Sequence, residues 1–154
     1  MINLSLQFQS NALTQKLRQL QGLVGNSDTP NRAIATQLYG WTIRNFNSRG
    51  NEANGTPWAP LRPSTVRYKE KIGKQQMLVI TGNLRQSFAG FSDANAAGVG
   101  ARASAFKGSR GDYARYLHEG TIHMPPRNLL PTEKAALDIG IRVYDLFISR
   151  AIAK

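Results

Sequence analysis

Two histidines are the only imidazoles that could serve as general bases or metal ligands in this chain of 154 residues. His118 and His123 lie five residues apart, with Gly120 between them. The nearest carboxylates, on Asp112 and Glu119, do not complete the His-x-x-x-His or His-x-Glu spacing of common metal sites. His118 beside Glu119 is typical of a hydrogen-bonded histidine that stabilises a turn, and we expect His123 to be exposed. We therefore predict no native metal site.

The remaining residue types do not indicate nucleophilic or acid–base catalysis. The chain contains no cysteine, which excludes thiolate nucleophiles, thiolate metal sites and disulfides. It has neither the Gly-x-Ser-x-Gly turn that exposes a catalytic serine nor a phosphate-binding loop. Nine acidic residues are scattered without a pair at an evident general acid–base spacing. The sequence predicts that the protein is not an enzyme and uses no cofactor.

Basic side chains are concentrated in the middle of the chain. The net charge is +11, and residues 62–110 hold nine basic residues against two acidic ones. Such a field attracts nucleic acid or an acidic protein face equally well. It is also compatible with a solvated surface that only confers solubility. The basic residues that are candidates for an interface or for DNA contacts in this region are Arg67, Lys69, Lys71, Lys74, Lys107 and Arg110.

Nucleic-acid binding is the second class of function to consider. Specific readers carry a recognition helix, zinc fingers or an aromatic sheet face, and none of these is evident here. Tyr68 lies within the basic stretch 67–74, so nonspecific contact with DNA stays an alternative. Arg127 follows two prolines, and we expect it to bind a carboxylate through two hydrogen bonds, within the subunit or across an interface.

Hydrophobic spacing predicts the elements that hold these residues in place. Alternating apolar residues over 2–8 predict a strand, and helical spacing predicts two helices, one after Ser10 or Asn11 and one capped by Asp28 or Thr29. Residues 47–63 are rich in Gly, Asn and Pro and predict an irregular connection. Within it Trp58 lies between two prolines. We interpret Trp58 as a core or loop anchor or, alternatively, as a contact with another protein.

The second half of the chain predicts a hairpin and a terminal helix. Residues 64–74 predict a short basic helix or an excursion, and 85–92 with 96–103 predict a hairpin around Asp93-Ala94-Asn95. The terminal helix begins at Pro131 and Thr132, and Gly140 is expected to weaken or kink it. Its large apolar residues form one predicted stripe, consisting of Leu137, Ile141, Tyr144 and Ile148, extended by Phe147 and Ile152.

The expected fold is α+β, in one domain over residues 1–154. A small mixed or antiparallel sheet would combine the N-terminal strand with the central hairpin. Two N-terminal helices and a C-terminal helix would pack on it, and long basic loops over about 62–77 and 104–111 would be flexible. Hydrophobic residues make up 41% of the chain, enough for a core. We expect no secretory signal, because residues 1–10 alternate apolar and polar side chains and lack a basic segment followed by an apolar core. We expect no membrane span, because no run of about 18 uncharged apolar residues occurs.

Four short motifs follow one another in a fixed order, and this order resembles the phage virion morphogenesis family, the tail-completion proteins of Mu-like and related tailed phages. The resemblance covers residues 55–130 well and the flanking helices only by pattern. The motifs are Gly55-x-x-Trp58-x-Pro60-Leu61, Leu78-x-x-Thr81-Gly82-x-Leu84, Tyr113-Ala114-x-x-Leu117-His118-x-Gly120 and Pro125-Pro126-Arg127-x-Leu129-Leu130.

The resemblance implies a structural protein of the phage neck, a hexameric tail-completion or tail-terminator ring that caps the tail tube and joins tail to head. A head-closure stopper or a connector adaptor of the same neck is the alternative, and a small nonspecific DNA-binding protein is the alternative from another class. Implied partners are copies of the chain, the tail tube protein, head-side neck or connector proteins and packaged DNA. The implied location is the virion, reached from the host cytoplasm during assembly. The expected structural anchors of the loops are Trp58, Leu61, Thr81, Gly82, Tyr113 and His118.

Overall fold

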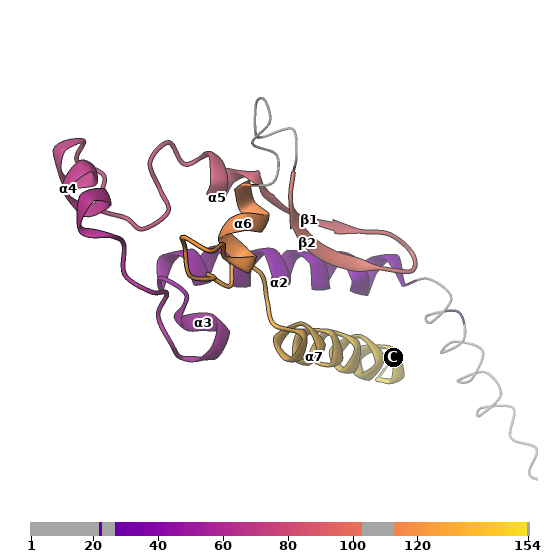
Figure 1. Cartoon of the computed structure of the whole chain (residues 1–154). Helices are drawn as coiled ribbons and strands as arrows, with labels where there is room; N and C mark the ends of the chain where they lie inside the picture. The colour runs from indigo at the N-terminus through magenta and orange to yellow at the C-terminus, as the bar shows by residue number, and fades with distance from the viewer. Residues whose placement is uncertain (1–21, 23–26, 103–112, 154) are drawn as a thin grey trace, which may run out of the picture.

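The computed structural model describes residues 22, 27–102 and 113–153 (Figure 1). Within these ranges six helices accompany a two-stranded antiparallel sheet, so the α+β class is confirmed. The predicted strand over 2–8, most of the first predicted helix and the loop 104–111 with Lys107 and Arg110 lie outside the described ranges. In chain order the elements are α2 (Asp28–Asn47), α3 (Asn51–Asn54), α4 (Pro63–Lys71), α5 (Asn83–Ser87), β1 (Phe88–Ser92), β2 (Ala97–Ala101), α6 (Tyr113–Glu119) and α7 (Glu133–Ile152).

Helix α2 runs through the middle of the molecule. In Figure 1 the hairpin of β1 and β2 lies along one side of α2 and α7 along the other. The predicted apolar face of α2 is confirmed, because Ile34, Leu38 and Trp41 are all buried. The predicted cap was wrong by one residue: Ser27 precedes the helix without a side-chain cap bond, and Asp28 is its first residue. There the acidic side chain faces the positive end of the helix dipole.

The hairpin is shorter than its sequence predicts. Its turn is the predicted one, since the Asp93 carboxylate accepts hydrogen bonds from the backbone N–H groups of Asn95 (2.7 Å) and Ala96 (2.8 Å). Residues 85–87, however, belong to α5 and not to the first strand, which begins at Phe88. The cause lies just upstream, where Gly82 adopts φ +86° and starts a helical turn. Leu84 and Ser87 are buried as helical residues.

Helix α7 continues through Gly140 and is not divided into two pieces there. Thr132 caps it, accepting a hydrogen bond from the N–H of Ala135 at 3.2 Å. Most of the predicted stripe is not the face that packs on α2. Leu137 and Ile141 are 60% and 52% exposed, whereas the buried residues are Ile139 and Val143. Of the stripe, Tyr144 does reach α2, where its hydroxyl donates a hydrogen bond of 3.0 Å to Asn31 Oδ1.

Two hydrophobic clusters make up the described core. One joins Ile34, Leu38 and Trp41 of α2 to Ile139 and Val143 of α7. The other joins the end of α2 to α5, α6 and the segment before α7, and it contains Phe46, Trp58, Leu84, Phe88, Leu117 and Leu129.

Residues 60–82, the basic arm, supply none of the buried members of these clusters, although Met77 and Leu78 pack against the second one. Figure 1 shows α4 standing away from the rest of the fold at the far end of this arm. Residues 63–71 of the expected loop are therefore helical, and Lys69 is the one buried residue of α4. Within the described ranges, none of the helices is both long enough and apolar enough to cross a membrane.

Candidate assembly surface

A cavity of about 830 Å³ opens between the basic arm and α6. Arm residues form one wall, and the segment after α6 forms the other. Three cations line it, on Arg62, Lys69 and Arg127, and none of its described lining residues is acidic. The apolar part of the lining includes Leu61, Leu78, Ile80, Leu84, Met124 and Pro125. The cavity therefore combines apolar walls with an unbalanced positive charge.

Lys69 is not the surface cation that the sequence suggested. Its side chain is 4% exposed, and its Nζ donates a hydrogen bond of 2.6 Å to the carbonyl oxygen of Val79. Burial lowers the pKa of Lys69 below its ordinary value of 10.5, and the positive charge of Lys74 lowers it further. Lys69 thus ties α4 to the returning segment of the arm, at the cost of a desolvated charge.

Arg127 is buried as well, at 4% exposure. One terminal nitrogen, Nη2, donates a long hydrogen bond of 3.4 Å to the carbonyl oxygen of Ala59, and its Nε has no hydrogen-bond partner. The backbone N–H of Arg127 donates to the carbonyl of Leu117 at 2.8 Å, which fixes the segment beside α6. None of the ion pairs between described residues includes Arg127. The expected carboxylate partner is not among them.

Trp58 is a core anchor and not a rim contact. Its side chain is 7% exposed and meets Phe46 edge to face, with ring centroids 5.5 Å apart. The indole Nε1 donates to the carbonyl oxygen of Asn128 at 3.1 Å, and Asn45 Nδ2 donates to the same oxygen at 2.7 Å. These bonds join α2 and the irregular connection to the segment that carries Arg127. Asn45 and Asn128 were not predicted as anchors, because nothing in their local sequence links them.

His118 has the structural role that the sequence indicated. Its Nδ1 accepts a hydrogen bond of 3.1 Å from the backbone N–H of Leu129, which joins α6 to the segment leading into α7. His123 is exposed, as predicted. The carbonyl oxygen of His123 accepts a hydrogen bond of 2.6 Å from Arg62 Nη2, so Arg62 of the arm reaches the turn after α6. That link was missed, since a contact across 61 positions leaves no local signal.

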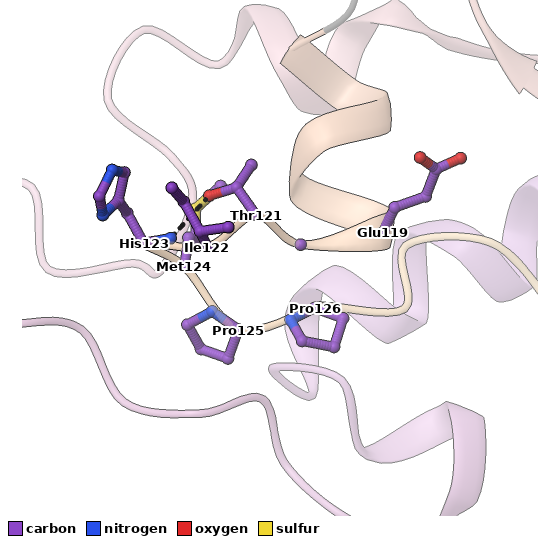
Figure 2. Close-up of a pocket in the computed structure, with 8 residues that line it drawn as sticks. Glu119, Thr121, Ile122, His123, Met124, Pro125 and Pro126 are labelled. Atoms are coloured by element: carbon purple, nitrogen blue, oxygen red, sulfur yellow. Dashed lines mark hydrogen bonds between the residues drawn. The ribbon is translucent and has the colours of Figure 1, made fainter.

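The turn after α6 borders a second, open hollow of about 540 Å³ (Figure 2). Gly120 allows the turn, because its φ is +80° and a Cβ there would lie 2.8 Å from the backbone nitrogen of Pro126. Thr121 and Met124 close the turn through backbone hydrogen bonds of 2.8 and 3.0 Å. In Figure 2 the side chains of Glu119 and His123 point away from each other, on opposite sides of the turn. They do not form an acid–base pair.

Comparison with known protein families decides the class of protein. The model of the phage virion morphogenesis family matches residues 8–141. The chain belongs to this family. The resemblance seen in the four motifs is thereby confirmed, and membership assigns the protein a structural or assembly role in the phage virion. No curated protein and no solved structure matches the chain.

The remaining candidate residues of this virion protein fall into two groups. Arg67, Lys71 and Lys74 are exposed on the arm, as expected of contact residues. The predicted anchors Leu61, Thr81, Gly82 and Tyr113 line the cavity. Among the described side chains, no three of His, Asp and Glu gather as they would in a metal site.

Proposed function

We propose that this virion protein is a subunit of the phage neck, a tail-completion or tail-terminator ring, hexameric, that caps the tail tube and joins tail to head. The basic arm is the observation that carries the proposal. It extends from the core and presents the exposed cations of Arg67, Lys71 and Lys74, yet Lys69 holds it in a defined shape. A charged and ordered extension of this kind suits contact with a neighbouring subunit, with the tube or with DNA in the lumen.

A ring built through the arm is consistent with the geometry of closed assemblies. The arm lies on one part of the molecule, so its contact with a second copy would join two different surfaces. Interfaces of this heterologous kind generate rings when the rotation between copies closes. The exposed cations of the arm would be neutralised by acidic groups of the next copy or of the tail tube.

We also propose that the protein transforms no substrate. Two observations support this view. The ring nitrogen Nδ1 of His118 is engaged by the N–H of Leu129, and the side chains of Glu119 and His123 diverge (Figure 2). An enzyme needs such groups to converge on a reacting atom.

The proposal is tested with a charge variant of the arm, Arg67→Gln/Lys71→Gln/Lys74→Gln. The matched control, Arg32→Gln/Arg49→Gln/Arg102→Gln, removes three exposed cations outside the arm. Both variants should change the free energy of unfolding by less than about 0.5 kcal/mol per site, as is usual on the surface. Native mass measurement should show sixfold rings for the wild type and the control, whereas the arm variant should stay smaller and be absent from purified particles.

The DNA-binding alternative makes the opposite forecast. A protein that acts alone on DNA would remain a monomer or dimer, with an affinity for duplex DNA that falls steeply with salt. A titration of the wild type with DNA at several salt concentrations distinguishes the two. Tight, salt-dependent binding without any ring would contradict the assembly proposal.

The position within the neck is tested in a phage that lacks the protein. A missing tail-completion ring should leave filled heads beside unjoined tails of uncontrolled length in electron micrographs. A missing head-closure stopper or adaptor should leave tails of normal length beside heads that lose their DNA. The second pattern would move the protein to the head side of the neck.

A further inference from the structure

The described lining of the cavity between the basic arm and α6 contains cations and no carboxylate. Arg127 is 4% exposed and its Nε has no hydrogen-bond partner, and Lys69, also 4% exposed, belongs to the same lining. Buried cations are normally paired, because desolvation of an isolated charge is costly. Since the described lining holds no acidic residue, a carboxylate from outside that lining would balance these charges.

The walls restrict what that carboxylate can be attached to. Leu61, Leu78 and Met124 make much of the lining apolar, and the volume of about 830 Å³ admits several side chains. An apolar wall favours a protein segment with large apolar side chains over the sugar–phosphate backbone of DNA, which would lose water there without burying apolar surface of its own. The expected occupant is therefore a carboxylate flanked by large apolar side chains.

The outer face of α7 offers this combination. Leu137, Ile141 and Ile148 follow one another at helical spacing on the side turned away from Ile139 and Val143. Leu137 and Ile141 are 60% and 52% exposed, which is unusual for two large apolar residues on one helix face.

Two carboxylates border this apolar stripe. Asp138 and Asp145 are exposed, lie seven residues apart on one flank of the stripe, and take part in none of the ion pairs between described residues. Two cations lie on the same flank. Lys134 is in the first turn of the helix, and Arg142 is further around the helix from the stripe than the two aspartates. The carboxylates therefore border the middle of the stripe. Their charge is opposite to that of the cavity.

We propose that the outer stripe of α7 in one copy docks into the cavity between the basic arm and α6 of the next copy, with an aspartate of α7 facing Arg127. Figure 1 shows α7 on the side of α2 opposite to the hairpin and α5. The two surfaces are different parts of one chain, so their pairing is heterologous and repeats from copy to copy. This inference rests on the proposed assembly of the chain into a ring, and it names the surfaces that meet.

Disulfide trapping tests the pairing directly, because the chain contains no cysteine of its own. Ile80→Cys places a thiol at the cavity, and Ile141→Cys places one in the middle of the stripe. Tyr39→Cys, exposed on α2 and absent from the cavity lining, is the control. After mild oxidation, the mixed Ile80→Cys and Ile141→Cys proteins should give about tenfold more disulfide between unlike chains than the control mixture, since docking raises the effective concentration of the two thiols.

A second measurement tests the charge. Asp138→Asn/Asp145→Asn should raise the dissociation constant between copies by about tenfold or more, because the buried guanidinium would lose its partner. Asp28→Asn, an exposed carboxylate on α2 paired with Arg32, is the matched control and should leave association unchanged.

Four results would overturn the inference. Ile141→Cys could pair with itself, which would show α7 against α7. Duplex DNA, and not a second copy, could protect the thiol at position 80 from alkylation. Rings could also form without a disulfide between the Ile80→Cys and Ile141→Cys chains. The neck proposal would then stand, and this pairing of surfaces would be wrong. If copies associate at no concentration and never enter particles, the neck proposal itself fails.

Discussion

Gly50 and Trp58 fit together so closely that a Cβ on Gly50 would lie 2.2 Å from Cδ1 of the indole. Gly50 also has φ +96°, a backbone conformation that favours glycine. The preceding carbonyl, on Arg49, accepts a hydrogen bond of 2.7 Å from the N–H of Trp58. The reversal of the chain after α2 therefore depends on a missing side chain, and it places the indole in the core.

Substituting Gly50 by alanine should destabilise the fold strongly. The left-handed backbone costs about 1–2 kcal/mol for a residue with a Cβ, and displacement of the indole adds about 1–3 kcal/mol. Gly55→Ala is the matched control, since its φ is +71° but nothing lies within 4 Å of a Cβ there. Urea unfolding should show only the backbone cost for the control. Equal losses in the two variants would contradict the close fit.

Removal of the indole itself should be equally costly. Trp58→Ala should lower the free energy of unfolding by about 3–5 kcal/mol, the range for a large buried aromatic residue. It would also remove one of the two donors to the Asn128 carbonyl. Ile122→Ala, at a residue 94% exposed, should stay within about 0.5 kcal/mol. A small effect at Trp58 with loss of assembly would make it an interface residue instead.

The hydrogen bond from Leu129 to His118 predicts a structural phenotype for the histidine. His118→Ala should lower the free energy of unfolding by about 1–3 kcal/mol. The backbone N–H of Leu129 would lose its acceptor, and Leu129 is only 1% exposed. His123→Ala, at an exposed position, should be close to neutral. Thermal unfolding of both variants makes the comparison. An activity abolished by His118→Ala in a protein that is otherwise stable would overturn the non-enzymatic proposal.

Local signals in the sequence were enough for several elements. The periodicity of Ile34, Leu38 and Trp41 predicted the buried face of α2, and Asp93 predicted the turn of the hairpin. Trp58 between two prolines predicted an anchor, and His118 beside Glu119 predicted a histidine that holds a turn. Each of these signals is contained in a few neighbouring residues, so no knowledge of the tertiary fold was needed.

Features that depend on distant neighbours were not predicted. The larger apolar stripe of α7 suggested its contact face, but α2 packs against Ile139 and Val143. Lys69 looks like its exposed neighbours Arg67 and Lys71 in the sequence, and only the returning chain at Val79 buries it. Spacing identifies which residues share a face, whereas the elements that cover a face are determined by the whole fold.

The buried ammonium of Lys69 predicts how stability changes with pH. Its pKa is lowered in the folded protein, first by burial and then by Lys74, so the unfolded chain binds more protons between that lowered pKa and 10.5. Stability should therefore rise with pH across this window, because the desolvation cost is fully present below it and relieved within it. Lys69→Met keeps the apolar length but has no charge to desolvate.

The difference in unfolding free energy between Lys69→Met and the wild type isolates this effect, since other titrating groups largely cancel. It should favour the variant most below the lowered pKa of Lys69 and shrink as the pH approaches 10.5. Lys71→Met, at an exposed neighbour on α4, should show no such trend. Urea unfolding at several pH values measures both differences. If the difference in unfolding free energy between Lys69→Met and the wild type stays constant through the window, the ammonium of Lys69 reaches water. Lys69 would then need no carboxylate from outside the cavity.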